Sequence, residues 1–358
     1  MRKILDLSLV GVTLLALAAC SETPPPAASG GAAGAPGSAG SAGAGGAPTS
    51  AGSGTGGAMG GAGTAGSAAG GMSGATAGGA TAGTAGSGGA SGAGGAIGDP
   101  AKPSAGCGKA NPPDGARTIM TGGQSANFNV NLPDNYNPAT PMPLGFGFHG
   151  FNNDECGPDS GECRGFAMLP AVTVYMKSIS AGWEQGPVLE QNITYWQDVL
   201  ALMKNEYCID ENRIFVAGVS SGGQFIEHLT CRFGDQLWQT TAVCAARVDP
   251  GNCMGTPPIL VIHGVTDGAG DYGNDTVEMF AERNGCSPTP PAGLEQARTE
   301  LMAAREAEEA EHICLDWEGC TANPVRFCIS SQITYSGLTH GWPMVGGQLI
   351  SEFHATLE

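Results

Sequence analysis

The stretch that most constrains the fold is Arg213-Ile214-Phe215-Val216-Ala217-Gly218-Val219-Ser220-Ser221-Gly222. Its apolar part predicts a strand covered on both faces, and the segment Gly222–Arg232 that follows predicts a helix. A serine at a sharp strand-to-helix turn, with glycine two positions before and after it, is typical of a serine nucleophile. Ser220 is the only serine of the chain with glycine at both positions. We therefore predict that Ser220 is a catalytic nucleophile.

Apolar segments alternate with helical patterns along residues 105–358. Besides Arg213–Gly218, strands are predicted at Phe128–Leu132, Leu144–Phe148, Thr241–Ala245, Ile259–His263 and Arg326–Tyr335. Further helices are predicted at Ile193–Asn205, Asp275–Arg283, Leu294–Glu311 and Gly347–Thr356. Strands that alternate with helices favour an α/β fold, with a mostly parallel central sheet and helices on both faces.

A serine nucleophile needs a histidine base, and the base needs a carboxylate that orients it. When a serine turn of this kind lies in an α/β sheet, the acid and then the histidine follow it along the chain. Asp267 comes soon after the predicted strand Ile259–His263, so we predict that it is the acid. Asp271 and Asp275 lie in the same loop and remain alternatives.

The predicted base is His340, one of three histidines beyond the predicted acid. It lies in a loop directly after the last predicted strand, whereas His312 and His354 fall at helix positions typical of surface histidines. His149 and His263 precede glycines at strand ends, and we interpret them as buried, hydrogen-bonded structural residues. A serine triad needs neither a metal nor an organic cofactor, and none is predicted.

Two backbone N–H donors must stabilise the oxyanion that forms when a serine attacks a carbonyl. One is predicted to be the N–H of Ser221, directly after the nucleophile. The other is predicted in the loop after the strand Leu144–Phe148, with Phe151 as the donor and Gly150 as the alternative.

The first hundred residues predict export of the protein. Residues 1–20 hold a basic start, a short apolar run and small residues ahead of Cys20, as in a signal peptide. The sequence Leu17-Ala18-Ala19-Cys20 resembles the bacterial lipobox, which implies a lipid anchor on Cys20 and an outer-membrane or cell-surface location. An ordinary secretory signal is the alternative. Residues 21–104 are almost wholly Gly, Ala, Ser, Thr and Pro, which predicts a disordered tether.

One folded domain is therefore predicted, over residues 105–358 of the 358-residue chain. The acidic and basic residues outside this domain balance, so the domain carries the whole formal net charge of −18. A surface this acidic repels phosphate backbones. The composition thus argues against a nucleic-acid partner and favours a neutral substrate.

The domain contains eleven cysteines, with Cys20 set aside for lipid. In an exported protein this density predicts a disulfide framework, and the odd number leaves one thiol without an intramolecular partner. The cysteines are scattered and no Cys-x-x-Cys pair occurs, so a structural zinc site is not predicted.

Motifs along residues 105–358 resemble those of the secreted polyhydroxybutyrate depolymerase, feruloyl esterase and acetylxylan esterase group of the α/β hydrolases. They are Val130–Pro133 with Tyr136, Phe148–Gly150, Cys208–Asp210 leading through Arg213 to Ser220, His263–Gly264 with Asp267, Asn284–Cys286, and His340–Pro343. The run from Cys314 to Cys328 is most similar to the feruloyl esterase branch. The resemblance implies an α/β-hydrolase fold stabilised by disulfides.

The resemblance also implies an extracellular serine esterase that hydrolyses carboxylic esters through an acyl-enzyme. Its expected substrates are feruloyl or acetyl esters of plant cell wall polysaccharide, and polyhydroxybutyrate is the alternative. Two further readings stay open from the sequence: a catalytically silent surface protein that binds a glycan or polymer, and a serine peptidase on the same fold.

Overall fold

The computed structural model describes residues 98–358, except 111, 152–155, 158–161, 164–165, 167–168, 185, 246, 249, 252, 268–271, 332–333 and 335–339. The described residues belong to one compact unit, Gly83–Glu358. The predicted signal peptide with Cys20, nearly all of the predicted tether, and Asp271 lie outside the described residues. No helix in the described part of the chain is long and apolar enough to cross a membrane.

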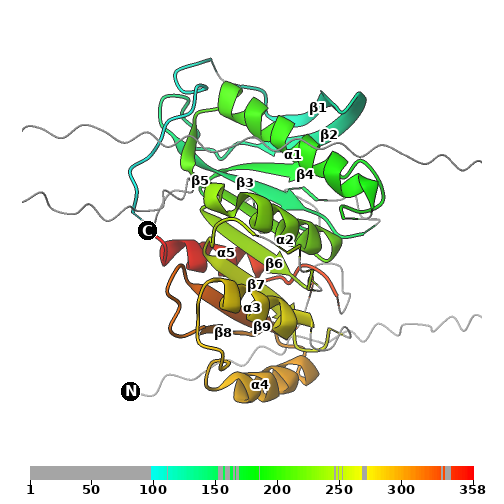
Figure 1. Ribbon diagram of the computed structural model, residues 1–358, viewed down its shortest axis with the longest axis vertical. Helices are drawn as coiled ribbons and strands as arrows, with labels where there is room; N and C mark the ends of the chain where they lie inside the picture. The colour runs from blue at the N-terminus through cyan, green and yellow to red at the C-terminus, as the bar shows by residue number, and fades with distance from the viewer. Residues whose placement is uncertain are drawn as a thin grey trace, which may run out of the picture. The chain divides into compact units, whose positions relative to one another are not determined.

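A central sheet runs through the unit, in the order β1-β2-β4-β3-β5-β6-β7-β9-β8 (Figure 1). The strands are β1 (Gly115–Thr121), β2 (Gln124–Asn131), β3 (Met142–Phe148), β4 (Val172–Met176), β5 (Ile209–Val219), β6 (Gln239–Val243), β7 (Ile259–Gly264), β8 (His312–Asp316) and β9 (Val325–Ser330). The six central strands, β4-β3-β5-β6-β7-β9, pair in parallel with their neighbours. The strands at the two edges of the sheet, β1 with β2 and β8, pair antiparallel. The prediction of a mostly parallel sheet is confirmed.

Helices cover both faces of the sheet, also as predicted. They are α1 (Pro187–Glu206), α2 (Ser221–Phe233), α3 (Tyr272–Arg283), α4 (Leu294–Glu306) and α5 (Gly346–Ala355). Helices α1, α2 and α3 lie in front of the sheet in Figure 1, and their side chains share one core with Val216 of β5. Phe353 of α5 belongs to a second core with Phe215 and Ala217. Because successive residues of the carboxyl half of β5, Ile214–Val219, enter opposite cores, that half of the strand is apolar throughout.

Several predicted boundaries were wrong. The strand predicted to reach Tyr335 ends at Ser330, and the helix predicted to reach Glu311 ends at Glu306. Glu308 adopts a φ of 58°, which takes the chain out of the helix, and β8 begins at His312. The strands β1, β4 and β8 were not predicted.

His354 was predicted at the surface, and the structure shows it only partly exposed. Its ring packs against Phe215 and Trp238, with ring centroids 4.6 Å apart in each pair. Burial lowers the pKa of His354 to about 3, so the ring is neutral at physiological pH.

Ten of the eleven cysteines of the domain form disulfides, which agrees with the predicted framework. The pairs are Cys107–Cys208, Cys156–Cys163, Cys231–Cys253, Cys286–Cys320 and Cys314–Cys328. The buried Cys244 is the free thiol. Five disulfides are typical of a protein that folds outside the reducing cytoplasm.

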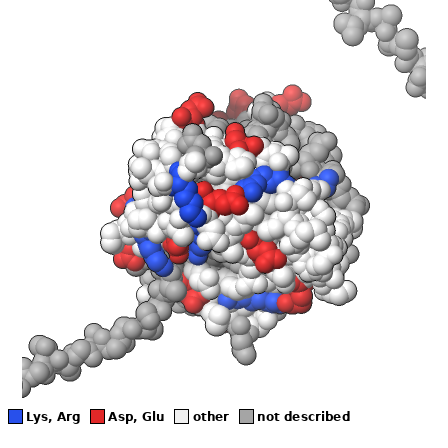
Figure 2. All heavy atoms as spheres, turned by 90° about the horizontal axis from the view of Figure 1, so that it is seen from above, with Lys and Arg blue, Asp and Glu red and all other residues white. Residues whose placement is uncertain are grey.

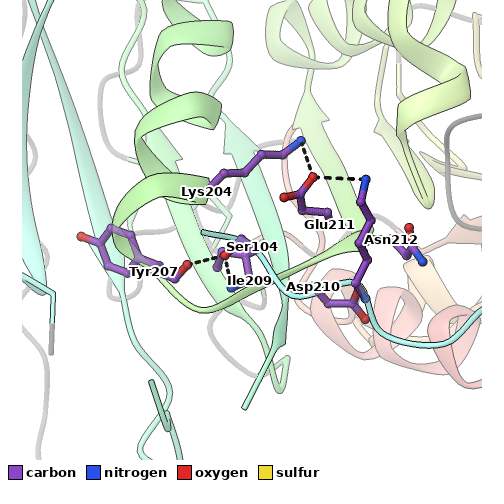
Figure 3. A network of polar contacts seen from close by, with 8 residues as sticks. Ser104, Lys204, Tyr207, Ile209, Asp210, Glu211 and Asn212 are labelled. Atoms are coloured by element: carbon purple, nitrogen blue, oxygen red, sulfur yellow. Dashed lines mark hydrogen bonds and ion pairs between the residues drawn. The ribbon is translucent and has the colours of Figure 1, made fainter. Parts of the chain in front are cut away.

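The N-terminal end of the described chain is attached at the amino end of β5 (Figure 3). Ser104 Oγ donates to the Tyr207 carbonyl (2.7 Å) and accepts from the Ile209 N–H (3.0 Å). The Lys102 N–H donates to Asp210 Oδ1 (2.8 Å), and the first disulfide joins Cys107 to the residue before β5. At about 3.3 Å per residue, the eleven residues of β5 span roughly 36 Å. The chain therefore enters the domain far from the carboxyl end of this strand.

One face of the surface is seen in Figure 2. It is largely uncharged, and its acidic and basic side chains lie among one another without a continuous basic patch.

Candidate active site

Ser220 lies at a strained turn between β5 and α2. It has a φ of 54° and a ψ of −118°, a conformation that costs a non-glycine residue on the order of 1–3 kcal/mol. A Cβ at Gly218 would lie 2.3 Å from the Gly222 carbonyl oxygen, and one at Gly222 would lie 2.4 Å from the Phe148 oxygen. Only glycine fits at both positions, which explains the glycines of the motif. The Ser220 N–H donates to the Val243 carbonyl of the next strand (2.9 Å).

Asp267 and His340 are in direct contact. The distance from His340 Nδ1 to Asp267 Oδ2 is 2.8 Å. This hydrogen bond, more than the nearby negative charges, raises the pKa of His340. Burial would raise the pKa of Asp267, but the bond from His340 and the neighbouring imidazoles hold it below its usual value. The carboxylate is thus ionised at neutral pH, and the alternative Asp275 lies in the first turn of α3.

Two further side chains surround the Asp267 carboxylate. His263 Nε2 lies 3.6 Å from Asp267 Oδ2, and His263 is buried without a hydrogen-bond partner in the described part of the chain. Its prediction as a buried residue is confirmed, but its prediction as a hydrogen-bonded residue is wrong. The Cys244 thiol donates to the Gly341 carbonyl (3.4 Å), beside His340.

Cys244, His263 and Asp267 could each offer one ligand atom to a metal ion, and these atoms lie within 4.8 Å of one another. Burial raises the pKa of the Cys244 thiol to about 12, and the Asp267 carboxylate is hydrogen-bonded to His340. In this arrangement Cys244 and His263 surround the predicted acid of the triad.

The loop after β3, His149–Phe151, is held on both sides. His149 is buried, its Nε2 accepts the Ser178 N–H (3.1 Å), and its Nδ1 therefore carries the proton that bonds the Gly150 carbonyl (2.6 Å). The Gly150 N–H donates to Glu162 Oε2 (2.8 Å). The structural role predicted for His149 is confirmed. Because the Gly150 N–H is engaged, Phe151 is the better placed of the two predicted donors.

Ser221, the other predicted donor, is the first residue of α2 and is buried. Its Oγ donates to Glu184 Oε2 (2.6 Å) and accepts the Trp183 N–H (3.2 Å). These bonds fix the side chain and leave the backbone N–H of Ser221 at the helix N-terminus, where positive dipole ends gather.

The candidate residues therefore lie at one edge of the sheet, at the carboxyl ends of parallel strands. Ser220 follows β5, Asp267 follows β7, His340 follows β9 and the loop with Phe151 follows β3. Ser220 and His340 form no hydrogen bond in the described part of the chain. Such contacts are often long in ligand-free enzymes and shorten when substrate binds.

Sequence analysis missed Glu162, Cys244 and Glu184 as neighbours of the site. Glu162 carried a local signal, because it precedes a cysteine that pairs only seven residues away. Cys244 was counted only among cysteines expected to form disulfides. Glu184 reaches Ser221 across 37 residues, and no sequence pattern indicates that contact.

Comparison with known proteins finds feruloyl esterases among the relatives of this chain. Feruloyl esterase D of Neurospora crassa is 26% identical over 235 residues, which cover 58% of this chain and 79% of that protein. Feruloyl esterase C of Emericella nidulans is 27% identical over 263 residues, which cover 69% of this chain and 87% of that protein. No protein-family model matches the chain.

Among solved structures, a feruloyl esterase module from Clostridium thermocellum is 15% identical, with a TM-score of 0.40, and covers 49% of this chain and 74% of its own. The assignment rests instead on the sequence relatives and on the strand order described above. The chain is a carboxylic ester hydrolase with the α/β-hydrolase fold, in the group that includes the fungal feruloyl esterases.

Proposed function

We propose that this protein is an extracellular serine esterase that hydrolyses feruloyl esters of plant cell wall polysaccharide. The observation that carries the proposal is the 2.8 Å bond between His340 and Asp267, at the sheet edge where Ser220 occupies a strained turn. The relatives named feruloyl esterases support the choice of acyl group.

In the proposed mechanism Ser220 attacks the ester carbonyl and forms an acyl-enzyme, which water then hydrolyses. His340 Nδ1 is bonded to Asp267, so Nε2 is the nitrogen that accepts the Ser220 proton and later passes it to the leaving alcohol. The backbone N–H groups of Ser221 and Phe151 stabilise the oxyanion. The ionised Asp267 stabilises the imidazolium that forms in each step.

The side chain of Phe151 supports an aromatic acyl group. It is 47% exposed, one of the few large apolar side chains at the surface, and it adjoins Gly182 next to Ser221. An exposed ring near Ser221, the residue after the nucleophile, offers a face for an aromatic ring of the substrate. A polyester such as polyhydroxybutyrate contains no aromatic ring and would leave this surface unused.

The proposal includes the organisation of the chain: a signal peptide over residues 1–20, a lipid anchor on Cys20, a flexible tether over 21–104 and the catalytic domain over 105–358. The bonds of Ser104 and Cys107 near the amino end of β5 support a catalytic domain that begins at about this point of the chain. A flexible tether would leave this domain free to turn relative to the membrane.

The experiment is hydrolysis of methyl ferulate, 4-nitrophenyl acetate and a 3-hydroxybutyrate oligomer by the purified protein and its Ser220→Ala variant. We expect turnover of the first two and its loss in the variant by at least about a thousandfold. Cleavage of the oligomer without methyl ferulate would identify a polyester depolymerase. Absence of turnover by the oxidised, folded protein would favour the binding-protein reading, and cleavage of a peptide anilide would favour a peptidase.

A further inference from the structure

Glu162 is fixed next to the active site by a short disulfide loop. Its neighbour Cys163 is fully buried and pairs with Cys156. A Cβ at Gly147 of β3 would lie 3.3 Å from Cys156 Sγ and 3.4 Å from Cys163 Sγ, so the disulfide packs directly on this strand. The Glu162 carboxylate is thereby held beside the end of β3, where the loop His149–Phe151 begins.

This loop contains two successive peptide groups, and three of their four polar groups are engaged. The Gly150 N–H donates to Glu162 Oε2 (2.8 Å), the His149 carbonyl accepts from Trp183 Nε1 (2.8 Å), and the Gly150 carbonyl accepts from the His149 ring (2.6 Å). The fourth group, the Phe151 N–H, has no acceptor in the described part of the chain. In a trans peptide the N–H points opposite to the carbonyl, so this N–H points away from the His149 ring.

We propose that Glu162 is a positioning residue for the oxyanion site: by accepting the Gly150 N–H, it fixes the loop so that the Phe151 N–H faces the reacting carbonyl. The inference rests on the proposed serine esterase function and deepens it. If Glu162 released Gly150, the His149–Gly150 peptide would keep only the bond from Trp183, and the next peptide, which carries the Phe151 N–H, would be positioned by its carbonyl alone. The donor would then be ordered only when substrate binds, at a cost in rate.

The carboxylate also faces the reacting groups. A Cβ built on Gly150 would lie 3.3 Å from Glu162 Oε1 and 3.6 Å from Ser220 Cβ, so Glu162 and Ser220 lie on the same side of this residue. The charge of Glu162 adds to the effect of Asp267 in raising the pKa of His340, while burial opposes both. His263, which touches Asp267, is kept neutral mainly by burial, which lowers its pKa. Removal of the Glu162 charge should therefore move the acidic limb of activity to lower pH.

The test compares Glu162→Gln with Glu162→Met. Both side chains are uncharged and close to glutamate in length, but only glutamine keeps an oxygen that can accept the Gly150 N–H. Glu162→Ala repeats the comparison without bulk, and Glu318→Gln is the control at an exposed carboxylate. The assays are kcat and KM for 4-nitrophenyl acetate across pH and inhibition by phenylboronic acid, which forms a tetrahedral serine adduct.

We expect Met and Ala to lower kcat by about ten- to a hundredfold with KM within about twofold, because one oxyanion donor is worth up to ~10²–10³ in kcat. Phenylboronic acid should bind these variants more weakly by a similar factor. Glu162→Gln should keep kcat within about threefold, and all three variants should shift the acidic limb to lower pH. The control should change neither quantity.

Equal kcat for the Gln, Met and Ala variants at the pH plateau would overturn the proposal, as would unchanged phenylboronic acid affinity in the Met and Ala variants. The acetate assay separates this test from the choice of substrate. A protein that cleaves the acetate but not methyl ferulate would refute the substrate class, while Glu162 would still be judged on the acetate data.

Discussion

Replacement of Gly222 by alanine tests whether the close packing of the serine turn on β3 sets the rate. A Cβ there would lie 2.4 Å from the Phe148 oxygen and 2.5 Å from the His149 oxygen. A real Cβ keeps at least about 3.0 Å, so the backbone must move apart by at least 0.6 Å, the difference between 3.0 and 2.4 Å. The two sides that separate carry the two proposed oxyanion donors, Ser221 and Phe151.

A displacement of 1 Å in a catalytic group can cost about a hundredfold in rate. We therefore expect Gly222→Ala to lower kcat for 4-nitrophenyl acetate by roughly ten- to a hundredfold. Overpacking should also lower the free energy of unfolding by about 1–3 kcal/mol, measured by chemical denaturation.

The matched control is Gly145→Ala, which lies within the core in β3, the strand against which Gly222 of α2 packs. Its Cβ would lie 2.5 Å from the Phe215 ring and 2.9 Å from the Phe166 ring, so the overpacking is similar but falls on side chains. This variant should lose stability and keep kcat within about threefold. If Gly222→Ala folds and retains the wild-type kcat, or if both variants lose the same factor, the reasoning about the serine turn is refuted.

The remaining predictions concern pH and stability. Because His340 must be neutral to accept a proton and its bond to Asp267 raises its pKa, kcat/KM for a neutral ester should fall on acidification through an apparent pKa above 6.5; a pH–rate profile with a limb below 6.5 would contradict this. Cys107→Ala with Cys208→Ala opens a loop of 101 residues and should lower the free energy of unfolding by up to about 4–5 kcal/mol in denaturant titrations, with kcat unchanged. Burial raises the pKa of Glu227 from 4.5 to about 8, so the folded state holds a proton that the unfolded chain releases; stability should fall as pH rises from about 4.5 to 8, and Glu227→Gln should flatten that dependence in melting experiments.

The fold was predictable where a segment is uniform in character. The carboxyl half of β5 and most of β7 are apolar because both faces of the sheet are covered there, and the glycines of the serine turn are dictated by close backbone contacts. The edge strands β1 and β8 are partly exposed and mixed in composition, so they give no clear pattern. β4 is a buried run of five residues, too short for periodicity to distinguish a strand from a helix segment.

The candidate site was likewise predictable from the sequence only in part. Ser220, Asp267 and His340 could be placed because each follows a recognisable strand, and parallel strands bring their carboxyl ends to one edge. The contact of Cys244 with Asp267 could not be predicted, because Cys244 follows β6 whereas Asp267 follows β7. His263 lies only four residues before Asp267, but its burial without a hydrogen-bond partner in the described part of the chain has no sequence signal. The partial burial of His354 likewise results from packing against Phe215 and Trp238, which lie more than a hundred residues earlier in the chain.

Two of the disulfides are expected to affect different properties of the domain, one its stability and the other the geometry of its active site. Cys107–Cys208 closes its loop at the amino end of β5, whereas Cys156–Cys163 packs on β3 close to the oxyanion loop. A long loop contributes mainly by limiting the unfolded chain, but a seven-residue loop contributes less in that way and more by fixing local geometry. Opening the first should therefore alter stability without altering kcat, and opening the second should alter kcat with a smaller loss of stability. That contrast follows only if the position of Glu162, and not the overall stability of the domain, determines how well the oxyanion site is ordered.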